Sequence, residues 1–198
     1  MEVVLEQGGT CILNSFRTPF ISVRTRYYRI DNHTSEDLHG DIRLNALFPF
    51  NLTHAFLPRL RASRRPVEVI FVGSQSADIS IPHLFTYAPS KSFIYQLTRC
   101  LNADEKVGPP SQIRFTYWNV GTVVTNGLRE KPSLFYPLAA KFAKHSLHVI
   151  GSGYEKVTPY APHAVQQFFV ELLPKSFLDH HAAKTMEHLL EEAQKRTD

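Results

Sequence analysis

Residues 67–74 read VEVIFVGS, and this run restricts the fold more than any other part of the chain. The run is apolar and rich in β-branched residues, and Pro66 directly precedes it. A strand with apolar residues on both faces has to be covered on both sides, as strands are in a parallel sheet flanked by helices. Residues 10–16 (TCILNSF) and 112–120 (QIRFTYWNV) also predict strands.

Amphipathic segments separate these strands. One helix is expected from a cap at Thr34 or Ser35 to about Leu60, with a kink or break at Pro49. Another is expected to begin close to Tyr87, because Pro89 is tolerated only in a first turn. Further helices are expected over residues 138–147, over 159–173 with Thr158 as its cap, and over 176–196. This order predicts an α/β fold that resembles half of a doubly wound parallel sheet.

Composition excludes several classes of function. The 198 residues suit a single domain, and the net charge of +4 comes without zinc ligands, a basic zipper or an RNA-binding signature, so nucleic acid is not an expected partner. The two cysteines, Cys11 and Cys100, form no CxxC pair and are expected to be packed thiols. His180 and His181 are adjacent and face different ways on a helix, so no metal site is expected there. His163 is expected to be structural.

Tyr87 and Lys91 are the first candidates for chemistry. At positions i and i+4 of a helix, their side chains project from the same face. A free tyrosine is a poor acid or base at neutral pH, and an adjacent ammonium is expected to lower its pKa. Such a pair can exchange a proton with the oxygen of a carbonyl or an alcohol. The alternative is a packed tyrosine that happens to lie one turn from a solvated lysine.

Ser74 and Asn45 strengthen the catalytic interpretation. Ser74 ends the clearest strand, thirteen residues before Tyr87, and sites in open α/β sheets form beyond the carboxyl ends of strands. Its hydroxyl could bond to the substrate oxygen that Tyr87 protonates. Asn45 lies in the preceding helix, and its amide could hold a water that feeds protons to Lys91. A hydrolase is not indicated, because no GxSxG elbow surrounds Ser74.

Together these residues resemble the short-chain dehydrogenase/reductase family. Ser74, Tyr87 and Lys91 match its serine and YxxxK signature, and the segment around Asn45 is similar to its asparagine helix. The segment NVGTVVT (119–125) is similar to the family's PGxVxT segment, with Val120 in place of proline. The finer resemblance is to the branch of hydroxysteroid dehydrogenases and very-long-chain 3-oxoacyl-CoA reductases, carried by the segments LNALFPFNLTHAFLPRL and YAPHAVQQFFVELLP.

The resemblance implies a role for each matching residue. Tyr87 would be the acid/base, Lys91 would also hold the nicotinamide ribose, Ser74 would polarise the carbonyl and Asn45 would complete a proton relay. The remaining cofactor contacts that it implies are Asn14 at the adenine ribose and Val123 and Thr125 at the nicotinamide carboxamide. The cofactor would be NADP or NAD, with NADP favoured, and the substrate a ketone or secondary alcohol such as a steroid or acyl-CoA in lipid metabolism.

The family's glycine-rich TGxxxGxG turn has no counterpart in the sequence. That turn and the helix after it normally hold the pyrophosphate. The resemblance therefore implies an N-terminally truncated, partial Rossmann-like sheet without its first βαβαβ half. The strand at 10–16 would then be an exposed edge, which residues 1–8 are too few to cover. The segment 20–30 is a weaker candidate for a cover.

The chain is expected to form a single, incomplete domain of the dinucleotide-binding type over residues 1–198. Residues 126–157 would form a lid-like segment, whose aromatic part at 135–147 could line an acyl site or be a packed surface helix, and residues 158–198 would be C-terminal helices. Two functions stay open: an NAD(P)-dependent oxidoreductase, or an inactive truncated homologue that acts as an interaction protein or is a gene fragment.

The expected location is cytoplasmic, or associated with the endoplasmic reticulum if the chain follows the branch that it resembles. Peripheral contact with a membrane and assembly into a homo-oligomer are both compatible with the sequence. No apolar run approaches the roughly 18 residues that a membrane helix needs.

Overall fold

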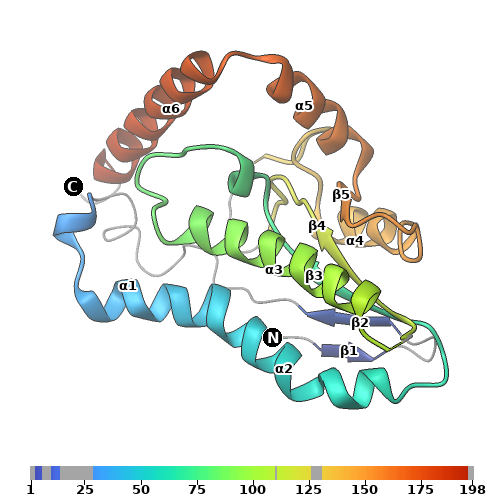
Figure 1. Cartoon of the computed structure of the whole chain (residues 1–198). Helices are drawn as coiled ribbons and strands as arrows, with labels where there is room; N and C mark the ends of the chain where they lie inside the picture. Colours follow the sequence, from blue (N-terminus) through green and yellow to red (C-terminus); the bar gives the residue numbers. More distant parts are fainter. Residues whose placement is uncertain (1–2, 6–9, 14–28, 110, 126–130, 196–198) are drawn as a thin grey trace.

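A computed structural model of the chain describes residues 3–5, 10–13, 29–109, 111–125 and 131–195. Figure 1 shows an α/β arrangement, with one sheet and helices on both of its faces. The strands are β1 (Val3–Leu5), β2 (Thr10–Leu13), β3 (Val67–Val72), β4 (Ile113–Trp118) and β5 (Lys156–Val157), and they lie side by side in this order. Strands β2 to β5 are parallel, which confirms the predicted fold class.

The edge of the sheet at β2 differs from the prediction. β1 pairs antiparallel with β2, with Val3 opposite Leu13 and Leu5 opposite Cys11. The expectation that residues 1–8 are too few to cover this edge was therefore wrong, because three residues suffice to pair most of a four-residue strand. The alternative cover at residues 20–30 lies outside the described residues except for Arg29 and Ile30.

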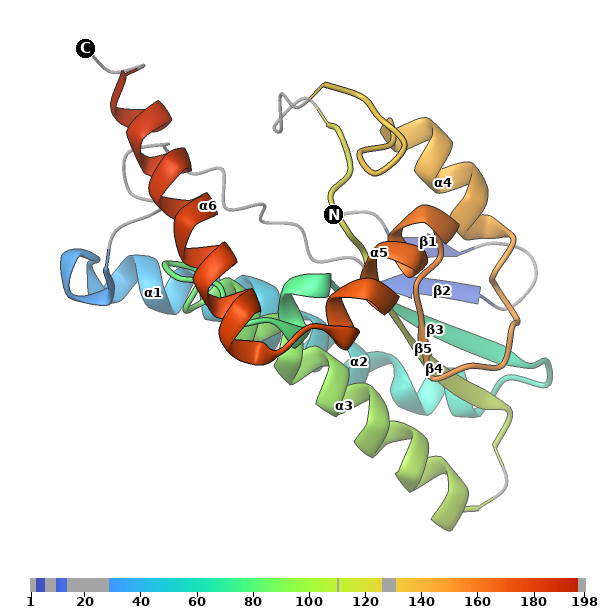
Figure 2. The same ribbon diagram turned by 90° about the horizontal axis from the view of Figure 1, so that it is seen from above.

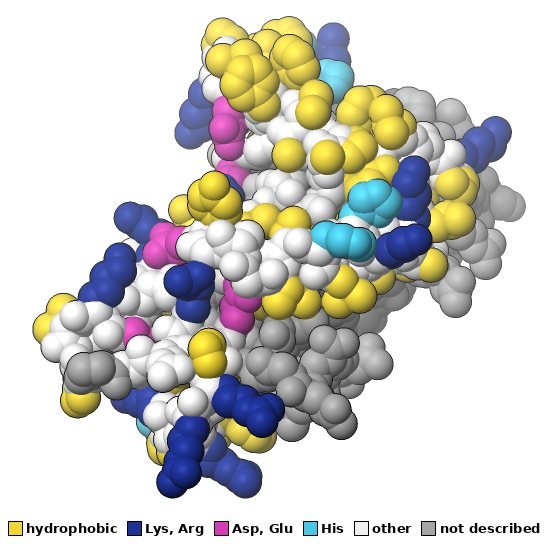
Figure 3. All heavy atoms as spheres, turned by 90° about the vertical axis from the view of Figure 1, so that its right-hand side faces the viewer, with side chains coloured by type: hydrophobic (Ala, Val, Ile, Leu, Met, Phe, Trp, Pro, Cys, Tyr) yellow, Lys and Arg dark blue, Asp and Glu magenta, His cyan; other side chains and the backbone are white. Residues whose placement is uncertain are grey.

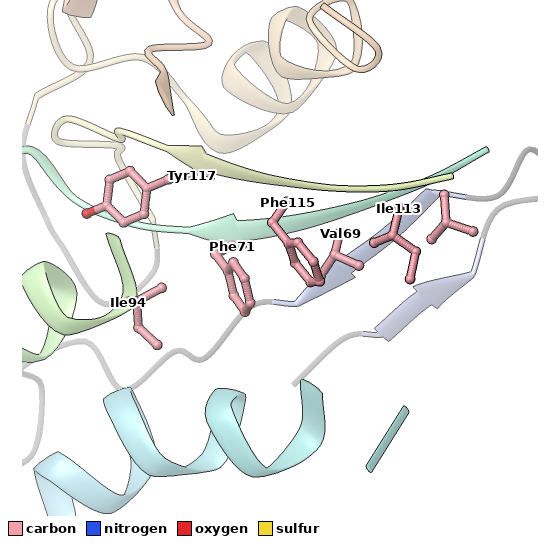
Figure 4. Close-up of a cluster of buried hydrophobic side chains, with 7 residues drawn as sticks. Val69, Phe71, Ile94, Ile113, Phe115 and Tyr117 are labelled. Carbon is pink, nitrogen blue, oxygen red and sulfur yellow. The ribbon is translucent and has the colours of Figure 1, made fainter. Parts of the chain in front are cut away.

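One face of the sheet carries the hydrophobic core. Alternate residues of β3 and β4 point to this face and pack against Ile94 of helix α3 (Tyr87–Val107). Phe71 and Phe115 stack with their ring centroids 6.3 Å apart, as Figure 4 illustrates. Three partly buried leucines of helix α2 (Phe48–Arg61) also pack against this cluster: Leu52, Leu57 and Leu60. The core thus ties α3, and with it Tyr87 and Lys91, rigidly to the sheet.

The opposite face is more polar. Figure 2 shows helix α4 (Ala139–Leu147) on the other side of the sheet from α3. Glu68 of β3 is buried on this face, where its two carboxylate oxygens accept hydrogen bonds from the hydroxyl of Thr116 and the backbone N–H of Gly151, both at 2.6 Å. A buried carboxylate with both oxygens bonded can hold a loop in place, here the loop between α4 and β5.

The helix expected from Thr34 to Leu60 is interrupted. Helix α1 (Ser35–Ile42) begins at the predicted cap, where the Thr34 side chain accepts a hydrogen bond from the backbone of Asp37. A π-helical turn, η2 (Arg43–Leu47), then separates α1 from α2. The interruption lies just before Pro49, which has no N–H for the carbonyl of Asn45, four residues earlier. Such π-turns occur frequently at functional sites.

The last two helices are α5 (Ala161–Leu172) and α6 (Lys175–Lys195). Tyr160 occupies the N-cap position of α5 without a capping side-chain hydrogen bond, so the predicted cap at Thr158 was wrong; α5 starts at Ala161 with Pro162 in its first turn. α5 buries the polar side chains of His163 and Gln167 and exposes four apolar residues spaced as one helical stripe: Val165, Phe168, Phe169 and Leu172. Figure 3 views the molecule from the right-hand side of Figure 1 and shows hydrophobic side chains gathered at the top. Among the described residues, the helices are too short or too polar to cross a membrane.

The packing of Phe115 generates a stability prediction. Phe115 is 0% exposed, so Phe115→Ala should lower the free energy of unfolding by about 3–5 kcal/mol through lost burial and a cavity. Phe168→Ala removes the same atoms from a side chain that is 59% exposed, and it should change stability by less than about 0.5 kcal/mol. Urea unfolding of both variants checks this, and equal losses would contradict the position of the core.

Candidate active site

Ser74 lies just beyond the carboxyl end of β3, and a tyrosine on the neighbouring strand fixes its backbone. The hydroxyl of Tyr117, on β4, accepts a hydrogen bond from the Ser74 N–H at 2.9 Å and donates one to the Ser74 carbonyl at 3.1 Å. Gly73 makes this contact possible, because a Cβ there would lie 1.9 Å from Cζ of the Tyr117 ring. The conformation of Ser74 is therefore set by its neighbours before any ligand binds.

Tyr87 lies at the first position of α3, and the side chain of Ser74 lies close enough to influence its phenol. Burial raises the pKa of Tyr87, and the Ser74 side chain acts in the opposite direction. The sequence led us to expect a lowered pKa from the adjacent lysine, and this was wrong in direction because loss of water around the phenol outweighs the other effects. At neutral pH Tyr87 is therefore protonated and able to act as an acid.

Lys91 is 3% exposed, and its Nζ donates a hydrogen bond to the carbonyl of Val72 at 3.1 Å. Its Nζ also lies 5.6 Å from the centre of the Tyr87 ring, so the predicted i, i+4 pair does share one face of the helix. Burial lowers the pKa of Lys91 from 10.5 to about 8. Lys91 is not a solvated surface residue, and this excludes the alternative that the sequence left open.

Asn45 is buried within the π-turn η2, which packs against α3. Its Nδ2 donates to the carbonyl of Asp41 at 3.1 Å, while its Oδ1 has no hydrogen-bond partner in the described part of the chain. A buried amide oxygen without a partner costs free energy unless a water or ligand bonds to it. Asn45 therefore lies beside the helix that carries Tyr87 and Lys91, and its Oδ1 can accept a hydrogen bond from a water or a ligand.

The predicted cofactor residues are only partly placed. Val123 and Thr125 follow β4 beyond the same edge of the sheet as Ser74, and the intervening Val124 donates its N–H to the carbonyl of Pro137. Asn14 lies outside the described residues.

Cys100 is exposed on α3, so its expected packing was wrong.

His163 fixes the turn that precedes Val123. Its Nδ1 accepts a hydrogen bond from the backbone N–H of Gly121 at 3.3 Å, so the ring proton is on Nε2, which lies 2.9 Å from the carbonyl of Phe135. Burial lowers the pKa of His163, while the hydrogen bond to the backbone of Phe135 raises it. The expected structural role of His163 agrees with these contacts.

Sequence reasoning missed two residues of the site, Tyr117 and Ser76. Tyr117 reads as one more aromatic residue of a strand, and only the pairing of β4 with β3 brings it to Ser74. Ser76 bonds to Ser74 through its backbone N–H and its hydroxyl. The S-x-S spacing in GSQSAD was the available signal, since serines two apart can form such turns. Across the described residues, no cluster of His, Cys, Asp or Glu could hold a metal ion.

The buried ammonium of Lys91 generates a pH prediction. Between pH 8 and about 10.5 the unfolded chain binds a proton at this lysine that the folded chain has lost, so this group makes stability rise with pH in that window. Lys91→Met removes the titration. The free energy of unfolding of the parent protein relative to Lys91→Met should therefore increase between pH 8 and pH 10, as measured by urea unfolding. Lys144→Met, at an exposed lysine, is the matched control. If the difference in the free energy of unfolding between the parent and Lys91→Met does not change with pH, a buried Lys91 is contradicted.

The clamp on Ser74 generates a second prediction. Tyr117→Phe leaves the N–H and the carbonyl of Ser74 without these partners, which should lower the free energy of unfolding by about 1–3 kcal/mol. Tyr136→Phe, on an exposed segment, should leave it unchanged. Thermal or urea unfolding distinguishes the two variants. Equal stability of Tyr117→Phe and Tyr136→Phe would show that the clamp does not form.

Comparison with known proteins identifies the chain's relatives. The family model described as short chain dehydrogenase matches residues 24–133. The chain is 30% identical to "Putative steroid dehydrogenase 3" of Caenorhabditis elegans over 151 residues, which cover 76% of this chain and 46% of that protein. It is 29% identical to a very-long-chain 3-oxoacyl-CoA reductase-like protein of Arabidopsis thaliana, over 62% of this chain and 39% of that protein. The chain thus spans about half the length of the curated relatives it matches.

Solved structures show the same fold. A short chain dehydrogenase from Burkholderia cenocepacia in complex with NADP superimposes with a TM-score of 0.54 at 22% identity, over 65% of this chain and 52% of that one. An alcohol dehydrogenase from the archaeon Thermococcus sibiricus, complexed with 5-hydroxy-NADP, gives a TM-score of 0.51 at 20% identity, over 84% and 57%. Fold, motif spacing and the family match agree, and the chain belongs to the short-chain dehydrogenase family.

Proposed function

We propose that the chain carries the catalytic half of an NAD(P)-dependent oxidoreductase that interconverts a ketone and a secondary alcohol. The observation that carries this proposal is that the buried Lys91 lies beside the Tyr87 ring, with Ser74 fixed at the nearby end of β3 by Tyr117. Two hydroxyl groups that meet at the end of a strand can both reach one substrate oxygen. The family match supports the same class of reaction.

Each side chain has a distinct task in this proposal. Ser74 donates a hydrogen bond to the carbonyl oxygen, and Tyr87 gives that oxygen its proton. Once Tyr87 has lost its proton, the Lys91 ammonium is the positive charge that faces the phenolate, 5.6 Å from the ring centre. Asn45 offers its unpaired oxygen to a water that can return a proton to Lys91. Because the pKa of Tyr87 is raised, reduction is favoured near neutral pH and oxidation should need a more alkaline medium.

The residues fit one end of a nicotinamide cofactor better than the other. In this proposal Tyr87, Lys91, Val123 and Thr125 hold the nicotinamide riboside, and the buried Oδ1 of Asn45, which has no partner among the described residues, supports a polar site next to α3. A nicotinamide bound there supplies or accepts a hydride. The sequence contains no glycine-rich turn for the pyrophosphate, so we expect weak binding by the chain alone. NADP is the favoured form, and the relative from B. cenocepacia was solved with it.

The substrate we propose is a ketone on a large apolar molecule, of the steroid or long-chain acyl-CoA type. The names of the relatives in C. elegans and A. thaliana point to these two classes. A cavity of about 680 Å³ also lies between the loop before α3 and helix α6, and Ser76, which bonds to Ser74, is part of its lining. Its lining is mostly apolar and includes Ser76, Ile79, Ile81, Leu84, Phe85 and Asp179.

An inactive homologue that acts only as an interaction protein is the second candidate. The missing glycine-rich turn favours it, because a dinucleotide without its phosphate cradle loses several strong hydrogen bonds. In this alternative Ser74, Tyr87 and Lys91 are relics that hold the fold. Their burial and their hydrogen bonds to neighbouring residues would then contribute to stability alone.

Turnover of a ketone with NADPH separates the two candidates. The purified chain is assayed by the loss of NADPH absorbance, and Tyr87→Phe should lower kcat by at least about 100-fold because proton transfer is lost. Tyr136→Phe is the control and should keep the parent rate. NADPH binding is followed in parallel by nicotinamide fluorescence.

Two outcomes would reject the oxidoreductase proposal. One is the absence of both binding and turnover at millimolar NADPH, which would favour the inactive homologue. The other is turnover that Tyr87→Phe leaves unchanged, which would place the chemistry elsewhere. Loss of turnover in Tyr87→Phe with unchanged thermal stability would support the proposed acid.

A further inference from the structure

Ser74 carries more hydrogen bonds than its proposed role in catalysis requires. Its Oγ caps the short 3₁₀ helix Gln75–Asp78 by accepting the backbone N–H of Ser76 at 3.2 Å. The same oxygen accepts the hydroxyl of Ser76 at 2.9 Å. Both donors therefore belong to one residue, which is 9% exposed.

These two bonds determine what the Ser74 hydroxyl can still do. A serine hydroxyl has two acceptor positions and one proton to donate. Ser76 fills both acceptor positions, so the Ser74 oxygen can accept no further hydrogen bond and its own proton has to point outward. The Tyr87 phenol lies near this outward side of Ser74, and the Ser74 side chain opposes the effect of burial on the pKa of Tyr87.

The reverse direction of the hydrogen-bond chain is disfavoured. If Ser74 donated to Ser76, the Ser76 hydroxyl proton would need another acceptor. In the described part of the chain, Ser74 Oγ is the hydrogen-bond partner of that hydroxyl. A buried hydroxyl proton without an acceptor is unfavourable, so the direction from Ser76 to Ser74 is preferred and the Ser74 proton points away from Ser76.

We propose that Ser76 is a positioning residue that orders the Ser74 proton toward Tyr87 and the substrate oxygen. Ser76 acts through Ser74 alone, and this role deepens the proposed function and rests on it. Donors in series polarise one another, so the Ser76 hydroxyl also makes Ser74 a stronger donor than an isolated serine would be. A ketone that enters the site thus meets a hydroxyl that can only donate.

The titration of Tyr87 tests this proposal without any requirement for turnover. 3-Fluorotyrosine at position 87 moves the phenol titration to lower pH, and its absorbance is followed in the parent protein and in Ser76→Ala. Ser76→Ala removes one donor to Ser74, so the pKa at position 87 should rise. Ser76→Thr keeps the hydroxyl and should restore the parent value. If Ser76→Ala does not fold, Ser76→Cys, with a weaker donor of similar size, is expected to shift the pKa in the same direction.

Two controls isolate the path through Ser74. Ser92→Ala removes a hydroxyl that lines the same cavity but bonds to the carbonyls of Ala77 and Ala88, and it should leave the titration unchanged. In a Ser74→Ala background, Ser76→Ala should add nothing, because the coupling runs through Ser74. An unchanged pKa in Ser76→Ala, or an equal shift in both backgrounds, would overturn the proposal.

Kinetics give a second readout where turnover is present. Ser76→Ala should lower kcat by roughly 3- to 10-fold with KM changed less than about twofold, since one neutral hydrogen bond is lost. A parent chain without turnover would count against the oxidoreductase proposal while the titration still decides the role of Ser76. A change in KM alone would contradict a role in ordering the proton.

Discussion

The Tyr117 hydroxyl is the contact on which the site depends. It bonds to both backbone groups of Ser74 across two neighbouring strands, and it can do so because residue 73 has no side chain. The parallel pairing of β3 and β4 sets the position of Tyr117, and the apolar core beneath α3 sets the position of Tyr87. The hydroxyl pair of Ser74 and Tyr87 is therefore a product of the sheet and of its core together.

Exclusion of water gives this site its electrostatic character. Burial raises the pKa of Tyr87 and lowers the pKa of Lys91 to about 8, so each group moves toward its neutral form. The protein opposes this trend with specific contacts, namely the Ser74 side chain near Tyr87 and the hydrogen bond from Lys91 to the carbonyl of Val72. A phenol that keeps its proton at neutral pH suits reduction of a carbonyl more than oxidation of an alcohol.

Local patterns predicted a large part of this arrangement. The apolar run at 67–74 gave β3, the start of α3 at Tyr87 followed from Pro89, and the cap at Thr34 formed as expected. Two features that the sequence did not reveal depend on residues that are distant in the chain or on tertiary burial. Tyr117 reaches Ser74 through strand pairing, and the pKa of Tyr87 follows from its surroundings more than from the lysine one turn away. Short pairing at β1 was missed because three residues carry almost no periodic signal.

The central claim is that the Tyr117 hydroxyl bonds to the backbone of Ser74 and so fixes Ser74 at the end of β3. A crystal structure of the chain would measure the distances from Oη of Tyr117 to the backbone N and O of Ser74 directly. We expect 2.9 Å to the nitrogen and 3.1 Å to the oxygen. A separation beyond about 4 Å, in a chain whose sheet and α3 are otherwise as described, would contradict it.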